Sequence, residues 1–200
     1  PGFPDAVDLA GQLTAMLAGW GGNGRFEAYT LERRPVAVRN VTEASANLRR
    51  MLQPKPKPAV FAETPEGAAA REEFGREFSE SMAREWTTLG IHLGYFYEGS
   101  PVIVPDGTPP PPEDTTEYVQ RARPGARAPH VWLADGRSPL DLFGPKFTLL
   151  CLGGSAPDGA ALIAAAAERG LPLQVENLDE PPVTAAYEAG LVLVRPDGHV

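Results

Sequence analysis

The chain has 200 residues, of which 42% are hydrophobic, and a formal net charge of −8 at pH 7. This acidic excess argues against a surface that binds nucleic acid or an anionic membrane, because phosphate groups are bound by basic faces. A single cysteine excludes an internal disulfide, no apolar run approaches the roughly 20 residues of a membrane span, and the leading residues lack a signal-peptide pattern, so we expect a cytoplasmic protein.

The first expected element is a helix that begins at Asp5, the predicted N-cap, and ends at the glycines around Gly21. Its free amides and partial positive charge at the start suit an electron-rich partner. Apolar residues recur at helical spacing, and we expect them to pack on a core. They are Leu9, Leu13, Met16, Leu17 and Trp20.

Two further helices are expected over 26–34 and 41–52, with a kink at Pro35 between them. Glu32, Arg33 and Arg34 could form an anion site. The simpler interpretation is that a carboxylate beside two guanidinium groups makes charge-assisted bonds that tie the helix to its neighbours.

Thr64 is predicted to cap a long helix after an exposed proline-rich loop. Residues four apart on this helix form one apolar stripe that we expect in the core: Phe74, Phe78, Met82 and Trp86. The alternation over 91–97 and the run 102–104 predict two strands. The prolines at 109–112 then begin a stiff spacer, and we place a domain boundary at 108–122.

The C-terminal part alternates strand and turn chemistry. We expect a short strand at 130–133, a turn at Asp135 and Gly136, a strand at 147–152 covered on both faces, a helix over 158–169, and strands at 171–175 and 191–194. A turn at 196–198 should start a return strand at His199. One right-handed βαβ unit with a closing hairpin predicts an α/β, thioredoxin-like layout.

Few residues offer chemistry of their own. Cys151 lies in an apolar strand without a CxxC partner, so we expect it buried, unpaired and redox-inactive. His92, His130 and His199 stand on separate predicted strands without metal-ligand spacing. The dinucleotide fingerprint GxGxxG is absent. We therefore predict no catalytic residue and no metal ligand in this chain.

Three stretches nevertheless resemble parts of one protein family, and they follow one another in the same order as in that family. The stretch 123–151, with Leu-Val-Leu-Val-Arg-Pro-Asp-Gly-His-Val at 191–200, closely resembles the C-terminal domain of flavin-dependent aromatic hydroxylases such as phenol hydroxylase, dichlorophenol monooxygenase and polyketide-tailoring oxygenases. The motifs at 5–9 and 29–37 resemble the helix and linker that close the flavin domain, and 89–107 resembles the connecting segment. The resemblance implies three parts: 1–107 from the end of the FAD-binding part, the linker 108–122, and a thioredoxin-like domain at 123–200.

The resemblance also implies a function. NAD(P)H would reduce bound FAD, and a flavin hydroperoxide formed with dioxygen would hydroxylate a small aromatic or polyketide-like substrate. By position, Gly2, Phe3, Pro4 and Asp5 would approach the flavin, although Gly11 and Gln12 stand where relatives commonly carry Trp and Lys. Both ends of the chain look cut, and catalytic residues would lie upstream.

Two alternatives stay open at this point. A Baeyer–Villiger variant of the same flavoenzyme class would use the same residues. A redox-inactive thioredoxin-like module could instead serve packing or dimerisation, and a homodimer is compatible with either interpretation.

Overall fold

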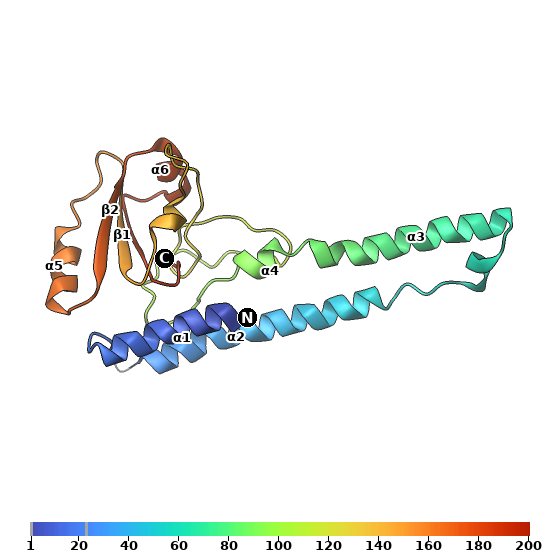
Figure 1. The fold of residues 1–200 in the computed structure, drawn as a ribbon, viewed down its shortest axis with the longest axis horizontal. Helices are drawn as coiled ribbons and strands as arrows, with labels where there is room; N and C mark the ends of the chain where they lie inside the picture. The colour runs from blue at the N-terminus through green and yellow to red at the C-terminus, as the bar shows by residue number, and fades with distance from the viewer. Residues whose placement is uncertain (1, 23) are drawn as a thin grey trace.

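The computed structural model describes residues 2–22 and 24–200, and it combines a long helical arm with a small α/β body (Figure 1). The elements are α1 (Gly2–Leu17), α2 (Arg25–Met51), η1 (Pro58–Phe61), α3 (Pro65–Trp86), α4 (Leu89–Leu93), η2 (Pro139–Leu142), β1 (Phe147–Leu152), α5 (Ala160–Glu168), β2 (Leu173–Leu178), α6 (Pro181–Tyr187) and β3 (Leu191–Val194). Helix α1 lies along the first half of α2 beside the body, and α2 and α3 run outward as the arm.

Helix α1 presents a different face to the protein from the one expected. It begins at Gly2, so Asp5 lies inside its first turn and is not the N-cap. Its buried residues are Asp8, Gln12 and Ala15, whereas the expected core residue Leu17 is 90% exposed. The predicted apolar inner face is therefore wrong at Leu13, Met16 and Leu17, because Arg33 of α2 and Arg195 after β3 bind the polar side of the helix. Leu9 and Trp20 are half-buried, and the Trp20 ring packs edge-on against Phe147.

Helix α2 is continuous through Pro35, so the expected division into two helices is also wrong. Arg39, one turn further on, donates to the carbonyl oxygens of Gly90 and Ile91 at 2.9 and 3.0 Å and pairs with Glu113. These bonds fix α2 against α4 and the following segment.

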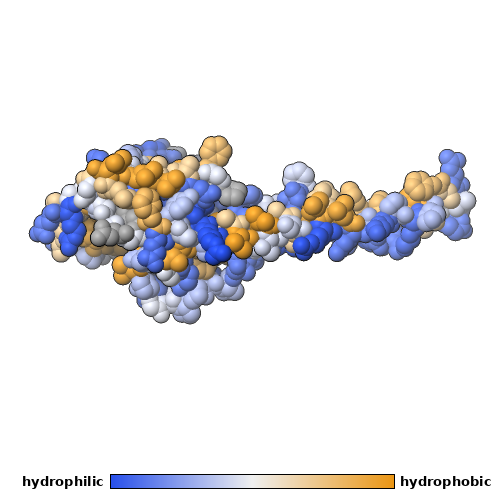
Figure 2. Space-filling view, turned by 90° about the horizontal axis from the view of Figure 1, so that it is seen from below, coloured by the Kyte–Doolittle hydropathy of each residue, from blue (hydrophilic) through white to orange (hydrophobic). Residues whose placement is uncertain are grey.

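Helix α3 starts as predicted, because the Thr64 hydroxyl accepts a bond from the Gly67 amide at 3.1 Å. The expected core stripe is wrong at Phe78 and Trp86, which are 43% and 82% exposed, and Phe74 and Met82 are only half-buried. The arm reaches away from the body, and apolar side chains gather along its surface (Figure 2). The exposed apolar residues on the arm include Val41, Leu48, Leu52, Phe61 and Phe78.

The two strands expected between 91 and 104 are absent from the described structure. Gly90 and Ile91 instead lie in α4 and donate to the carbonyl oxygens of Thr116 and Thr115 at 3.1 Å. A Cβ at Gly90 would lie 2.2 Å from the Asp114 carbonyl oxygen. Close packing against the linker therefore overrides the local alternation. The proposed domain division at 108–122 stays a prediction.

The C-terminal body contains the expected sheet, in the order β2-β1-β3. Strands β1 and β2 are parallel and β1 and β3 antiparallel, with Leu150 facing Glu176 and Val192. Strand β1 is covered on both faces, as predicted. Helix α5 and strand β3 also lie where expected. The predicted turns carry positive φ at Gly136 and Gly198. The prediction of a short strand at 130–133 is wrong, because no strand forms there.

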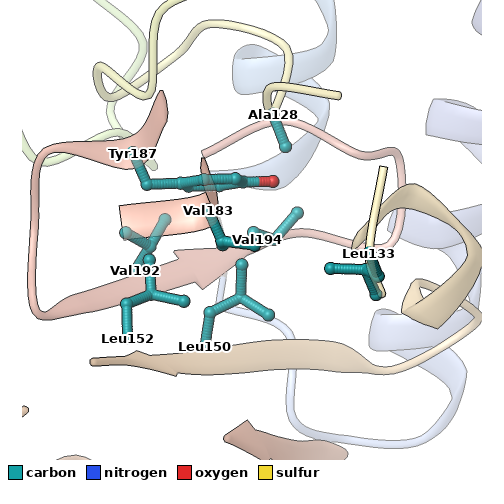
Figure 3. Packing of buried hydrophobic residues seen from close by; sticks show 8 residues of the cluster. All are labelled: Ala128, Leu133, Leu150, Leu152, Val183, Tyr187, Val192 and Val194. Carbon is teal, nitrogen blue, oxygen red and sulfur yellow. The ribbon is translucent and has the colours of Figure 1, made fainter. Parts of the chain in front are cut away.

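One apolar cluster holds this body together (Figure 3). Its buried members are Ala128, Leu133, Leu150, Leu152, Val183, Tyr187, Val192 and Val194. Helix α6 was not predicted, and it contributes Tyr187, whose hydroxyl donates to the Pro129 carbonyl oxygen at 2.8 Å. Within residues 2–22 and 24–200, no helix is long and apolar enough to cross a membrane.

Candidate functional site

The four residues predicted to approach a flavin lie together in the first turn of α1. Gly2, Phe3 and Pro4 are exposed, and Phe3 is 91% exposed. The Asp5 carboxylate points sideways to α2, where it accepts a bond from Arg33 Nε at 2.8 Å. Because the first amides of a helix have no partner within it, this end of α1 offers donors to a partner.

Arg33 connects this turn to the segment that follows α4. It is 4% exposed, and its Nη1 donates to the Tyr97 hydroxyl at 3.0 Å. Its guanidinium also lies 5.3 Å from the centre of the Tyr95 ring. Burial raises the pKa of Tyr97, so its hydroxyl stays protonated and can accept the Arg33 bond.

A second group of charges, here called the Arg195 cluster, joins α1 and α2 to the C-terminal domain. It consists of Asp8, Glu32, Arg195 and Asp197. Arg195 binds Glu32 with both terminal nitrogens, at 2.8 and 2.9 Å, and its Nη2 also lies 2.9 Å from Asp197 and 3.4 Å from Asp8. Glu32 is only 1% exposed and also accepts a bond from Ser100 at 2.5 Å.

The cluster shifts the pKa values of its two aspartates, Asp8 and Asp197, in opposite directions. Burial raises the pKa of Asp8, and Arg195 only partly opposes this effect. Burial also favours a higher pKa for Asp197, but His199 and Arg195 outweigh it and hold the pKa of Asp197 at about 2. The His199 ring lies 3.4 Å from Asp197 and stacks on Tyr97 with 4.5 Å between ring centres.

The two arginine–carboxylate groups decide between the two interpretations of Glu32, Arg33 and Arg34, an anion site or bonds between helices. Glu32 and Arg33 tie α2 to its neighbours, as the simpler interpretation predicted, whereas Arg34 is exposed. Their partners were not foreseen, because Arg195 lies 163 residues from Glu32 in the sequence. Only the adjacency of Glu32 and Arg33 hinted at buried pairing.

The remaining candidates are Cys151 and the residue types that bind metal ions. Cys151 is buried and unpaired, as predicted. Over the part of the chain that the structure describes, no group of three His, Cys, Asp or Glu side chains could hold a metal ion. A cleft of about 1210 Å³ separates α1 from β3 and the segment before the C-terminal domain, and its walls include Val7, Trp20, Val102 and Leu193.

The sequence and the fold both match known proteins. Residues 121–200 match the family model described as aromatic-ring hydroxylase, C-terminal. The FAD-dependent monooxygenase opdD of Penicillium oxalicum is 31% identical over 208 residues, which cover all of this chain and 40% of that protein. The chain spans 34–40% of the length of the curated relatives it matches first.

The fold of the whole chain is also similar to that of solved structures. The rebeccamycin biosynthetic enzyme RebC with reduced flavin is 40% identical with a TM-score of 0.88, over 100% of this chain and 37% of that one. The flavin-dependent monooxygenase PieE in complex with FAD and substrate is 29% identical with a TM-score of 0.78, over 98% of this chain and 40% of that one. Residues 121–200 therefore match the aromatic-ring hydroxylase C-terminal family model, and the whole chain is similar in sequence and fold to part of flavin-dependent monooxygenases.

Proposed function

We propose that this chain is the C-terminal portion of an FAD-dependent monooxygenase that hydroxylates a small aromatic or polyketide-like substrate. The observation that carries the proposal is that the similarity covers the whole chain, α1 and the arm included, and not only residues 121–200. If the chain were a module used only for packing, its similarity to these monooxygenases would not need to extend to α1.

In this proposal the start of α1 faces the flavin through Gly2, Phe3, Pro4 and Asp5. The exposed first turn fits the group, because its amides and the positive end of the helix dipole favour the electron-rich edge of a flavin ring. When bound, FAD supplies the oxidation chemistry, with NAD(P)H as reductant and dioxygen as oxidant. The residues of this chain bind and orient the ring, and residues 123–200 do not touch it.

The outward apolar side chains support the same arrangement. Phe3 on α1, and Val41 and Trp86 on the arm, are exposed although they are large and hydrophobic. Apolar side chains that gather on an exposed surface mark an interaction site. We propose that the flavin-binding part of the enzyme covers it and keeps water from the reaction.

The test uses the enzyme that carries this chain together with its flavin-binding part. The purified protein should show the visible absorbance of bound FAD and should consume NAD(P)H faster when phenolic or polycyclic aromatic compounds are added. Residues 1–200 alone should be colourless. An enzyme that stays colourless after incubation with FAD would contradict the proposed function.

A cytoplasmic location and a homodimer complete the proposal. The single cysteine and the acidic charge support the first. The oligomeric state is measured by light scattering of the purified enzyme, in which a monomer at all concentrations would exclude the homodimer.

A further inference from the structure

We propose that Arg33 and Arg195 are positioning residues that hold the start of α1 in the orientation that FAD requires. Through them the C-terminal domain controls flavin binding without touching the flavin. This inference rests on the proposed function, because it assigns a role to side chains behind the proposed flavin-facing turn.

The first contact chain begins in that turn. Asp5 binds Arg33 of α2 at 2.8 Å, Arg33 binds the Tyr97 hydroxyl at 3.0 Å, and the Tyr97 ring stacks on His199 of the C-terminal domain with 4.5 Å between ring centres. The Tyr97 backbone amide also donates to the Gly125 carbonyl oxygen at 2.9 Å. Three contacts therefore connect the C-terminal hairpin to the first turn of α1.

The second contact chain reaches α1 one turn later. Arg195, in the C-terminal domain, lies 3.4 Å from Asp8 of α1 and binds Glu32 of α2 with two bonds. Glu32 and Arg33 are neighbours in α2, so the two contact chains meet on the same turn of that helix. One arginine of the C-terminal domain thus contacts both α1 and α2.

Together the two contact chains fix the rotation of α1 about its axis. Asp5 and Asp8 are three residues apart and share one face of the helix. While both are bound, Phe3 is 91% exposed, and Val7 lies in the wall of the cleft between α1 and β3. A rotation of α1 would move the first-turn amides and Phe3 away from the flavin.

Apolar packing does not fix this rotation by itself. The buried side chains of α1 are Asp8, Gln12 and Ala15, and its large apolar residues Leu13 and Leu17 are exposed. The side that faces the protein is therefore held mainly by polar contacts. Charge-assisted bonds are directional, so they can set an orientation that a smooth apolar face would leave loose.

The test compares variants of the FAD-loaded enzyme. Arg33→Lys and Arg195→Lys keep the charge but lose the forked geometry, and Tyr97→Phe removes only the bond from Arg33 while keeping the ring stack. For each variant, the FAD dissociation constant is measured by fluorescence titration, and the visible circular dichroism of the bound flavin reports the orientation of the ring. The thermal midpoint is measured in parallel.

Two controls separate positioning from general stability. Arg137→Ala removes an exposed pair with Asp135 in the same domain. Val183→Ala removes buried apolar atoms from the core cluster and should lower the thermal midpoint without touching either contact chain. Both controls should keep the wild-type FAD affinity and flavin spectrum at temperatures where they are folded.

We expect Arg33→Lys and Arg195→Lys to weaken FAD binding by about 10- to 100-fold, the equivalent of one charge-assisted hydrogen bond, with an altered flavin spectrum. Tyr97→Phe should give a smaller loss in the same direction. Unchanged affinity and spectrum in all three folded variants would overturn the inference, as would an equal loss in Val183→Ala. A wild-type enzyme without FAD would overturn the proposed function itself.

Discussion

The substitution Glu32→Ala should destabilise the chain more than any change to a surface charge. Glu32 is 1% exposed and accepts two bonds from Arg195 and one from Ser100. Without this carboxylate, Arg195 keeps Asp197 at 2.9 Å, Asp8 at 3.4 Å and the Tyr97 ring, whose centre lies 5.2 Å away. Breaking a buried pair in this way costs about 3–5 kcal/mol of unfolding free energy.

Urea denaturation of residues 1–200, followed by circular dichroism, measures this loss. The matched control is Arg137→Ala, whose pair with Asp135 is 59% and 50% exposed and should contribute less than about 1 kcal/mol. Removing Glu32 and Arg195 together should cost less than the sum of the two single changes, because either single change already removes the two bonds between these residues. A loss below about 1 kcal/mol for Glu32→Ala would show that water already solvates the Arg195 cluster and would refute the reasoning.

Four further predictions concern other parts of the chain. The folded pKa of Asp197 is depressed to about 2 from a reference value of 3.8, so the stability it contributes is present above pH 3.8 and is lost as the pH falls toward 2; Asp197→Asn should flatten this loss in acid titrations. Cys151→Ala should cost about 1 kcal/mol in urea denaturation, and native Cys151 should react slowly with thiol reagents, whereas rapid labelling would contradict its burial. Gly90→Ala should lower the thermal midpoint, because the new Cβ meets a backbone oxygen at 2.2 Å; an unchanged midpoint would mean that the linker can shift. Limited proteolysis should cut first within 108–122, and a first cut within 130–152, detected by mass spectrometry, would exclude that boundary.

The sheet of the C-terminal body could be predicted from the sequence because its signals are local. The apolar run of β1, the glycine that ends α5 and the turn before His199 each act within a few residues. The predicted strand Leu191–Val194 is confirmed for the same reason, since an apolar run flanked by turn residues suits a strand.

The inner face of α1 could not be predicted, because its partners are distant in the sequence. Asp8 and Arg195 are 187 residues apart, and no periodicity marks such a pair. Local apolar spacing therefore assigned the wrong side of α1 to the interior. The resemblance to flavoenzymes indicated the first turn, but not that Arg33 binds the Asp5 carboxylate.

The arm shows a second limit of local patterns. Spacing by four residues predicted that Phe78 and Trp86 lie in a core, and both are exposed in the described structure. The pattern marks an apolar face of α3. It cannot indicate whether that face is covered by residues of the same stretch of sequence.

Hydrogen–deuterium exchange of the enzyme with and without FAD tests the central claim most directly. If the start of α1 faces the flavin, FAD should slow exchange at the amides of residues 2–9, while β1 and β3 of the C-terminal body change little. Unchanged exchange at the start of α1, or protection confined to residues 123–200, would contradict the account.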